Sequence, residues 1–306
     1  MDTIFGYVTD RLHAWVTDRS SIDGLVTVGF LLTLLIIDIA RRGGRFSWPL
    51  RAVKGVFATL SIYHLNFLML PLLGFAVYWF NSTYTALNLP AIPASFWSGI
   101  PAWALLIIGL LSYDFSNYWI HRLMHTKWFW PTHAIHHSDP DVNGLSTFRV
   151  HFLETVLVYG SYTLLLTWMG IPADTTGVGA FLMSLHIMYV HVDVDWDHGP
   201  FKFVFASPRF HRWHHADVPE AHGKNLANMF PFLDLMFGTY VKPGARDTPL
   251  GAQGVPQHEV ISLMAFPFTE WSRMVGDAVK QTAAKLSRTS KDNRPVPEPR
   301  AVPVRD

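Results

Sequence analysis

Residues 55–80 read GVFATLSIYHLNFLMLPLLGFAVYWF and contain no charged side chain. A helix needs about 20 apolar residues to cross the hydrocarbon core of a bilayer, so this run predicts a membrane-spanning helix. Similar apolar runs occupy 24–40, 98–120, 153–171 and 176–191. The last two are close together in the chain and are predicted either to cross the bilayer or to form a hairpin that re-enters it. The sequence therefore predicts an all-α integral membrane fold with four or five transmembrane or re-entrant helices.

The composition of the whole chain supports this class. Charged residues make up 15% of the 306 residues, whereas a typical soluble domain has about 25%. The formal net charge is only +1, so we expect no nucleic-acid partner. The chain has no cysteine, which excludes disulfides, thiolate zinc sites and iron–sulfur clusters within it.

The distribution of basic residues predicts an orientation in the membrane. Arginine and lysine are frequent in 41–54, whereas 81–97 carries no charge. Because cytoplasmic loops are rich in these residues, 41–54 is expected in the cytoplasm and 81–97 outside. The later spans then return the chain to the cytoplasmic side near His121 and near His191.

Histidine is concentrated in three short motifs. The first motif, at 121–125, has two histidines four residues apart, and the motifs at 133–137 and 211–215 share the form H-x-x-H-H. Side chains four residues apart lie on one face of a helix, so such a pair can hold one ion. The middle histidine of an H-x-x-H-H motif projects to the side and can address a second ion. The motif histidines are His121, His125, His133, His136, His137, His211, His214 and His215.

The number of these histidines favours two metal ions, because a single zinc site uses only three or four protein ligands. Imidazole binds zinc, copper, iron and nickel, so ligand type alone leaves the metal open. A histidine-lined metal transporter is the rival from another class, but it predicts ligands near the bilayer midplane and repeated halves. The motifs lie at span ends instead, and no repeat is visible. A zinc hydrolase with an H-E-x-x-H motif is also disfavoured, because that motif is absent.

The motifs and their spacing resemble the fatty acid hydroxylase / sterol desaturase superfamily of membrane di-iron enzymes. The resemblance covers about 100–240, and within the superfamily the chain is most similar to alkylglycerol monooxygenases and to bacterial sterol-desaturase-like proteins. The stretches that carry it are Asp114–His125, His133–Ser138, Arg149–Glu154, Ser207–His215, Lys224–Asn225 and Asp234–Thr239.

The resemblance implies an O₂-dependent hydroxylase or monooxygenase that oxidises a C–H bond of a fatty-acyl, sterol or ether lipid. It implies two iron ions, O₂ as co-substrate, a lipid substrate taken from the bilayer and a separate electron-transfer reductase as external electron donor. Desaturation of the lipid at the same site stays open as the alternative, because both reactions use the same metal chemistry.

The family pattern also implies the ligands. A histidine outside the motifs completes the set, and His191 occupies the matching place, whereas His186 lies off that helical face. The implied metal ligands and catalytic residues are His121, His125, His133, His136, His137, His191, His211, His214 and His215.

Several polar residues are expected to support these ligands. Asp114 precedes His121 by two helical turns and is expected to orient the histidines of the first motif. Asn225 is expected to support the site from behind the third motif. The polar group at 149–154 is predicted either to form an internal ion pair or to support the site.

Three regions are therefore predicted. Residues 1–21 form an amphipathic interfacial helix, 22–271 form the membrane di-iron oxygenase domain, and 272–306 form a polar, disordered cytoplasmic tail. The domain is expected to carry a cytoplasmic helical cap with the histidine-rich dimetal site. The protein is expected to be a multi-pass protein of a bacterial inner (cell) membrane with its active site on the cytoplasmic side.

Overall fold

The computed structural model of the chain describes residues 22–41 and 50–292. Within these residues the secondary structure is helical, with a single isolated β-bridge between Ala216 and Leu250 and no named strand. This confirms the predicted all-α class. The predicted interfacial helix at 1–21 and the end of the predicted tail at 293–306 lie outside the described residues.

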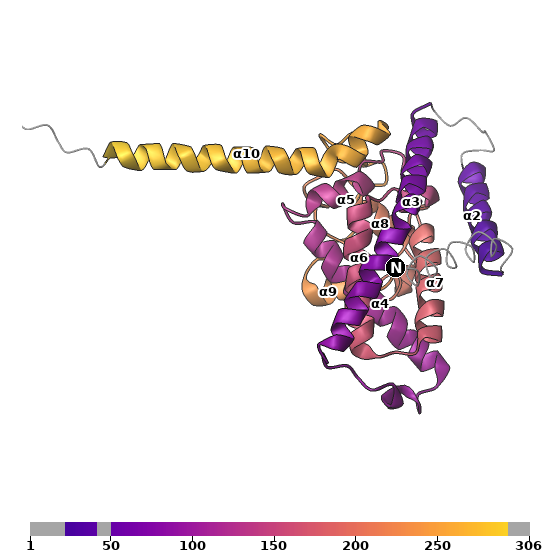
Figure 1. Cartoon of the computed structure of the whole chain (residues 1–306). Helices are drawn as coiled ribbons and strands as arrows, with labels where there is room; N and C mark the ends of the chain where they lie inside the picture. The colour runs from indigo at the N-terminus through magenta and orange to yellow at the C-terminus, as the bar shows by residue number, and fades with distance from the viewer. Residues whose placement is uncertain (1–21, 42–49, 293–306) are drawn as a thin grey trace, which may run out of the picture. The chain divides into compact units, whose positions relative to one another are not determined.

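Five longer helices coincide with the five apolar runs. They are α2 (Ile22–Arg41), α3 (Leu50–Ala86), α4 (Ala102–Met124), α6 (Phe152–Met169) and α7 (Ala173–Val190). Helix α4 packs against both α6 and α7, and α3 packs against α6 (Figure 1). The central position of α4 explains why its sequence mixes small, aromatic and polar residues: it faces neighbouring helices on several sides.

Among the described residues, two helices are long and apolar enough to cross a membrane, at Ala52–Ala86 and Phe152–Met169. Helix α7 contributes a shorter apolar stretch, Thr175–Val190. Helix α3 has 37 residues, which correspond to about 55 Å and exceed the roughly 30 Å of hydrocarbon in a bilayer. Phe57 and Trp79 on α3 are among its exposed large apolar side chains, as expected of a lipid-facing helix. The predicted total of four or five membrane helices stays a prediction.

The main core lies where α4 meets α7 and the segment that follows α8. Tyr113 and Tyr118 of α4 pack with Met183 of α7 and with buried residues between 226 and 233. This cluster fixes the loop 224–230, which becomes important for the histidines.

Helices α6 and α7 form a hairpin whose turn depends on Gly170. This residue ends α6 in the left-handed conformation, with φ 61°, and its N–H donates to Leu166 O. A Cβ atom at this position would lie 2.3 Å from Ile92 O, so both the backbone angle and the close approach of the chain at Ile92 require glycine.

Shorter elements complete the domain. They are η2 (Ala94–Trp97), α5 (Trp130–His137), η3 (Gly144–Phe148), η4 (Gly199–Phe201), α8 (Pro208–His214) and α9 (Phe232–Phe237). Helices α5 and α8 lie at the end of the bundle where α4 ends (Figure 1). Helix α8 begins sharply because the Ser207 side chain accepts the N–H of Phe210 and Pro208 occupies the first turn.

The C-terminal helix α10 spans Val260–Asp292. The chain divides into two compact units, 1–266 and 267–306. The helical part of the second unit carries apolar side chains at Phe268, Trp271, Val275 and Val279, so one face is apolar. The predicted tail from 272 thus begins as a helix that reaches Asp292, as this three-and-four spacing of apolar residues favours. The disorder predicted for the tail after a short helix stays a prediction.

Candidate metal centre

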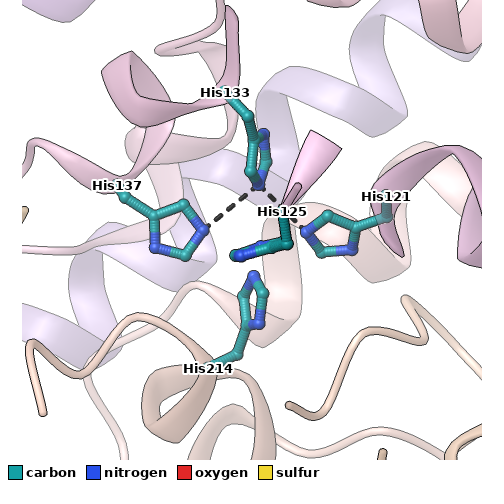
Figure 2. A group of neighbouring side chains, drawn as sticks. All are labelled: His121, His125, His133, His137 and His214. Atoms are coloured by element: carbon teal, nitrogen blue, oxygen red, sulfur yellow. Dashed lines mark hydrogen bonds between the residues drawn. The ribbon is translucent and has the colours of Figure 1, made fainter. Parts of the chain in front are cut away.

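The structure brings the nine predicted histidines together in two groups. In each group every residue offers a ring nitrogen within 4.8 Å of those of the others. The first group consists of His121, His125, His133, His137 and His214, and the second of His136, His191, His211 and His215. In Figure 2 the five rings of the first group point toward a common centre.

The two H-x-x-H-H motifs are divided between the groups in opposite ways. In α5, His133 and His137 belong to the first group and His136 to the second. In α8 and its cap, the pair four residues apart, His211 and His215, belongs to the second group, and the middle histidine belongs to the first. This arrangement follows from helix geometry, because residues four apart share a face while the residue between them points aside.

His191 reaches the second group from the end of α7. It follows the last helical residue as the C-cap, and its Nδ1 lies 2.7 Å from Ile187 O. Its Nε2 lies 3.1 Å from His136 Nε2 and 3.0 Å from His211 Nε2. His186, one turn and a half earlier, belongs to neither group.

Backbone carbonyls define the tautomers of several rings. His121 Nδ1 lies 2.7 Å from Leu226 O, and His214 Nδ1 lies 2.8 Å from Lys224 O. A carbonyl oxygen can only accept, so each Nδ1 must carry the proton and each Nε2 presents a lone pair. His133 Nδ1 likewise donates to Glu154 Oε1 at 2.8 Å. This backing by carbonyls and a carboxylate is how metal-bound histidines are usually oriented.

The contacts between ring nitrogens fit a shared cation. His133 Nε2 lies 3.0 Å from His121 Nε2 and 3.1 Å from His137 Nε2, as the dashed lines in Figure 2 show. The Nε2 atoms of His121 and His133 both present lone pairs, so no proton lies between them to form a hydrogen bond. Two nitrogens about 2.1 Å from one ion lie about 3.0 Å apart at a right angle and about 3.4 Å apart at a tetrahedral angle. The observed separations match such an edge.

Burial keeps these imidazoles neutral, which is the form that binds metal. Desolvation lowers the pKa of His121 to about 4, with the neighbouring His191 adding to the effect. Desolvation also holds the pKa of His214 and His215 well below its usual range. In addition, the Nε2 atoms of His125 and His214 are buried and have no hydrogen-bond partner among the described residues. The residues present therefore fit a metal ion in each group.

The loop 224–230 supplies the carbonyls behind His121 and His214 and is itself held by buried carboxylates. Asp234 accepts the N–H groups of Leu226 and Ala227 at 2.7 and 2.9 Å. Asp114, which is fully buried, accepts the N–H groups of residues 228, 229 and 230 at 2.9, 3.1 and 2.6 Å.

Asp114 thus does not contact the imidazoles themselves, and the role in orienting the histidines of the first motif stays a prediction. Asp114 lies seven residues before His121, about 10 Å along the helix, and the loop 224–230 lies closer to it than the rings do. Its effect on the histidines is indirect, through the loop that provides Leu226 O.

Asn225 also acts on backbone rather than on a ring. It adopts a left-handed conformation with φ 55°, and its Oδ1 accepts the N–H of Val241 at 2.8 Å. Its Nδ2 lies 3.4 Å from Phe210 O in α8. Asn225 therefore links the loop to the helix that carries the third motif.

The structure separates the roles of the polar group at 149–154. Arg149 is fully buried and donates to Ile135 O, at 3.3 Å, and to Ser138 Oγ, at 3.0 Å, at the end of α5. Glu154 instead binds His133. The two residues support the same motif from different sides and do not form the internal ion pair that was left open.

Some supporting groups were missed by sequence reasoning. The carbonyls of Leu226 and Lys224 have no signal in the sequence, because any residue provides a carbonyl. Asp234 could have been found, since it lies in a stretch that resembles the family, whereas Glu154 belongs to the polar group at 149–154, for which support of the site was one of the two predicted roles.

A cavity of about 420 Å³ reaches both groups from between α4, α6 and α7. We call it the bundle cavity. His133 of the first group and His211 of the second line it at one end, together with Glu154, and it continues past Tyr162 and Leu166 of α6. A second cavity of about 350 Å³, the loop cavity, is lined by His125, His137 and His214 and by residues of the 216–223 and 251–253 loops.

Comparisons with known proteins agree with this geometry. Residues 106–239 match the model of the fatty acid hydroxylase family. The matched part of the chain is thus similar to this family over 134 of the 306 residues. The matched range contains all nine histidines, both carboxylates that hold the loop 224–230, and Glu154.

Several characterised relatives are similar to this chain. The ornithine lipid hydroxylase OlsE of Rhizobium tropici is 28% identical over 61% of this chain and 57% of its own length. The alkylglycerol monooxygenase of Xenopus tropicalis is 28% identical over 54% of this chain and 34% of its own. Methylsterol monooxygenase 1-3 of Arabidopsis thaliana is 30% identical over 44% of this chain and 47% of its own. The chain thus spans about a third to just over half of these relatives, and no solved structure matches it.

Proposed function

We propose that this protein is an O₂-dependent lipid hydroxylase that oxidises a C–H bond at a histidine-bound di-iron centre. The observation that supports this most directly is the convergence of five and four histidine side chains at one end of a cavity between α4, α6 and α7. The lipid monooxygenases among the relatives support the substrate class. Zinc has no redox chemistry, whereas iron in both groups would supply the oxidation of the C–H bond by O₂.

The reaction balances only with an external reductant. One oxygen atom of O₂ enters the C–H bond as a hydroxyl group, and the other leaves as water after taking up two electrons and two protons. The sequence contains no cysteine that could hold an iron–sulfur cluster, and we propose a separate electron-transfer protein as the donor. We also propose that the domain is integral to the membrane with the histidines on the cytoplasmic side, as the charge distribution predicts.

The protein's own residues would bind the lipid, orient the histidine rings and shield the reacting carbon from water. The bundle cavity would hold the lipid tail between α6 and α7 and present one carbon to both groups. The apolar and aromatic side chains of its walls, such as Val158, Tyr159 and Met183, would exclude water from the reacting carbon. Glu154 and the carbonyls of the loop 224–230 would keep the ring nitrogens turned inward.

The test combines metal content with product analysis. Purified protein is expected to contain two irons per chain, and cells with the gene are expected to contain a lipid one oxygen atom heavier than cells without it. Growth under ¹⁸O₂ should place the label in that lipid, whereas desaturation would give a loss of two hydrogens and no label.

One variant for each group makes this test specific. His214→Ala and His136→Ala should each lower the product at least about 100-fold, because loss of even a bond behind a metal ligand costs about 10- to 100-fold, and each should lower the iron content. His64→Ala, at an exposed histidine of α3, is the matched control and should leave both unchanged. Normal product from folded His214→Ala and His136→Ala variants would refute the proposal.

A further inference from the structure

The two carboxylate oxygens of Glu154 have different surroundings. Oε1 accepts the Nδ1–H of His133 at 2.8 Å. Oε2 is buried and makes no hydrogen bond to any described residue. The side chain is only 8% exposed, yet Glu154 lines the bundle cavity. The free oxygen is therefore enclosed by protein and borders the cavity proposed to hold the substrate.

A buried carboxylate oxygen without a partner is costly, because it has lost its water and gained no hydrogen bond. The bond from His133 fixes the carboxylate in place, so Oε2 cannot turn away to find a partner elsewhere. Burial raises the pKa of the Glu154 carboxyl well above its usual range, whereas the Nδ1–H that His133 donates to Oε1 stabilises the ionised form. In that form Oε2 only accepts hydrogen bonds, and a donor placed against it would stabilise the charge further. The group that satisfies Oε2 must therefore be a donor, an O–H or an N–H.

The position of Glu154 along the bundle cavity indicates where on a bound lipid the donor group would lie. Glu154 and Leu166 both line the bundle cavity, and twelve residues of α6 separate them, about 18 Å along the axis. Ala180 and His191 line it from α7 and are separated by about 16 Å on the same basis. The cavity is thus elongated, and Glu154 lies at the end where the histidines lie.

We propose that Glu154 Oε2 binds a hydroxyl or N–H group of the lipid substrate, close to the carbon that is oxidised. This inference rests on the proposed function and narrows its substrate class. The tail of such a lipid would extend toward Leu166. Its donor group, bound to Glu154, would fix the position of the lipid along the cavity so that a nearby carbon faces the histidines.

The experiment measures binding without turnover, so that it does not depend on the proposed reaction. Zinc fills nitrogen sites readily and has no redox chemistry, so the full chain is loaded with zinc in detergent micelles. The probes are 1-dodecanol and its methyl ether, which share a tail and differ in the donor. Isothermal titration should show the alcohol binding about 10-fold or more tighter than the ether, as expected for a hydrogen bond to a charged group.

Glu154→Gln replaces the hydrogen-bond acceptor at the Oε2 position with a donor. The glutamine oxygen can still accept from His133 Nδ1, which leaves an NH₂ group where Oε2 was. The preference for the alcohol should fall to about 1-fold, because both probes can accept from an amide and neither meets an acceptor. Thr163→Val removes a different hydroxyl from the wall of the same cavity and should keep the alcohol preference.

Equal binding of both probes to the unaltered protein would overturn the proposal, as would an unchanged preference in Glu154→Gln. The comparison of the two probes on the unaltered protein tests the proposal even if Glu154→Gln does not fold. Failure of the proposed function shows separately, as a lack of oxidised lipid in cells, and leaves this binding measurement intact.

Discussion

The two histidine groups share both H-x-x-H-H motifs, yet their rings are supported differently. In the first group three rings are held from behind, by Leu226 O, Lys224 O and Glu154 Oε1. In the second group only His191 has such a bond, to Ile187 O.

The remaining Nδ1 atoms of the second group lack comparable support. Those of His136, His211 and His215 are buried and have no hydrogen-bond partner among the described residues. The cavities also differ, since the loop cavity reaches the first group alone. A sequence motif therefore fixes which residues meet, while the surrounding backbone decides how firmly each ring is held.

Acid is expected to have the largest effect and to act on both groups alike, because burial is common to them. The ordinary imidazole pKa is about 6.5, whereas that of His121 in the fold is about 4. Between these values the unfolded chain binds more protons, so the free energy of unfolding falls as the pH falls. For His121 alone the loss approaches about 3 kcal/mol at pH 4, and the contribution is complete above pH 6.5.

Thermal unfolding of the metal-free protein in micelles, followed by tryptophan fluorescence from pH 7.5 to 4.5, measures this effect. Tm should fall steadily below pH 6.5. A Tm that stays constant across this range would show that the rings are already protonated or open to water. A constant Tm would therefore contradict the conclusion that burial keeps the histidines of both groups neutral.

Metal affinity is where the groups should differ most. Each bond behind a metal ligand is worth about 10- to 100-fold in affinity, and the first group has two more such bonds and one more ligand than the second. We therefore expect its affinity to be at least about 100-fold higher. Titration of the metal-free protein with Co²⁺ should show two separate steps.

The variants already introduced assign these steps. His214→Ala should abolish or weaken the tighter step and His136→Ala the weaker one. Equal affinities, or the reverse assignment, would mean that the bonds to the loop 224–230 and to Glu154 do not control metal binding.

A smaller effect is expected when the loop behind the first group is loosened. Asp114→Asn replaces one of two accepting oxygens with an NH₂ group that faces a backbone N–H, so at least one bond to the loop is lost. The affinity of the first group should fall about 10-fold through Leu226 O, and that of the second group should not change.

The same Co²⁺ titration reports both values for Asp114→Asn. Asp247→Asn, at an exposed aspartate, serves as the control. A loss of affinity shared equally by both groups would argue against a specific path from Asp114 to His121 and for a general loss of structure.

The two histidine groups also show which features of the site can be predicted from the sequence alone. The meeting of nine histidines follows from the spacing of the motifs together with the family resemblance, and the opposite division of His136 and His214 follows from helix geometry. The role of Asp114 does not follow, because helical periodicity tells which face a residue occupies but not what packs against that face. The carbonyls of Leu226 and Lys224 are invisible for the same reason: they depend on the path of a loop.

The longer elements show the same limit. The apolar runs predict helices at the right places, and α3 and α6 are apolar over a full membrane-spanning length. The chain after 267 carries two opposing signals. Its polar composition predicts disorder, whereas the regular three-and-four spacing of its few apolar residues favours the helix that reaches Asp292.

The smallest effect is expected at Asn225, which touches the support of the first group only through backbone. Asn225→Gly keeps the left-handed conformation but removes the acceptor of the Val241 N–H and the weak contact to Phe210 O. The free energy of unfolding should fall by about 1 kcal/mol, and the Co²⁺ affinity of the first group should change by less than about 3-fold. Asn225→Ala is the matched comparison, because it loses the same bonds and adds strain at φ 55°. It should therefore be clearly less stable than Asn225→Gly in the same unfolding measurement. If the two variants were equally stable, the left-handed backbone would contribute nothing, and the link between the loop 224–230 and α8 would rest on the side chain alone.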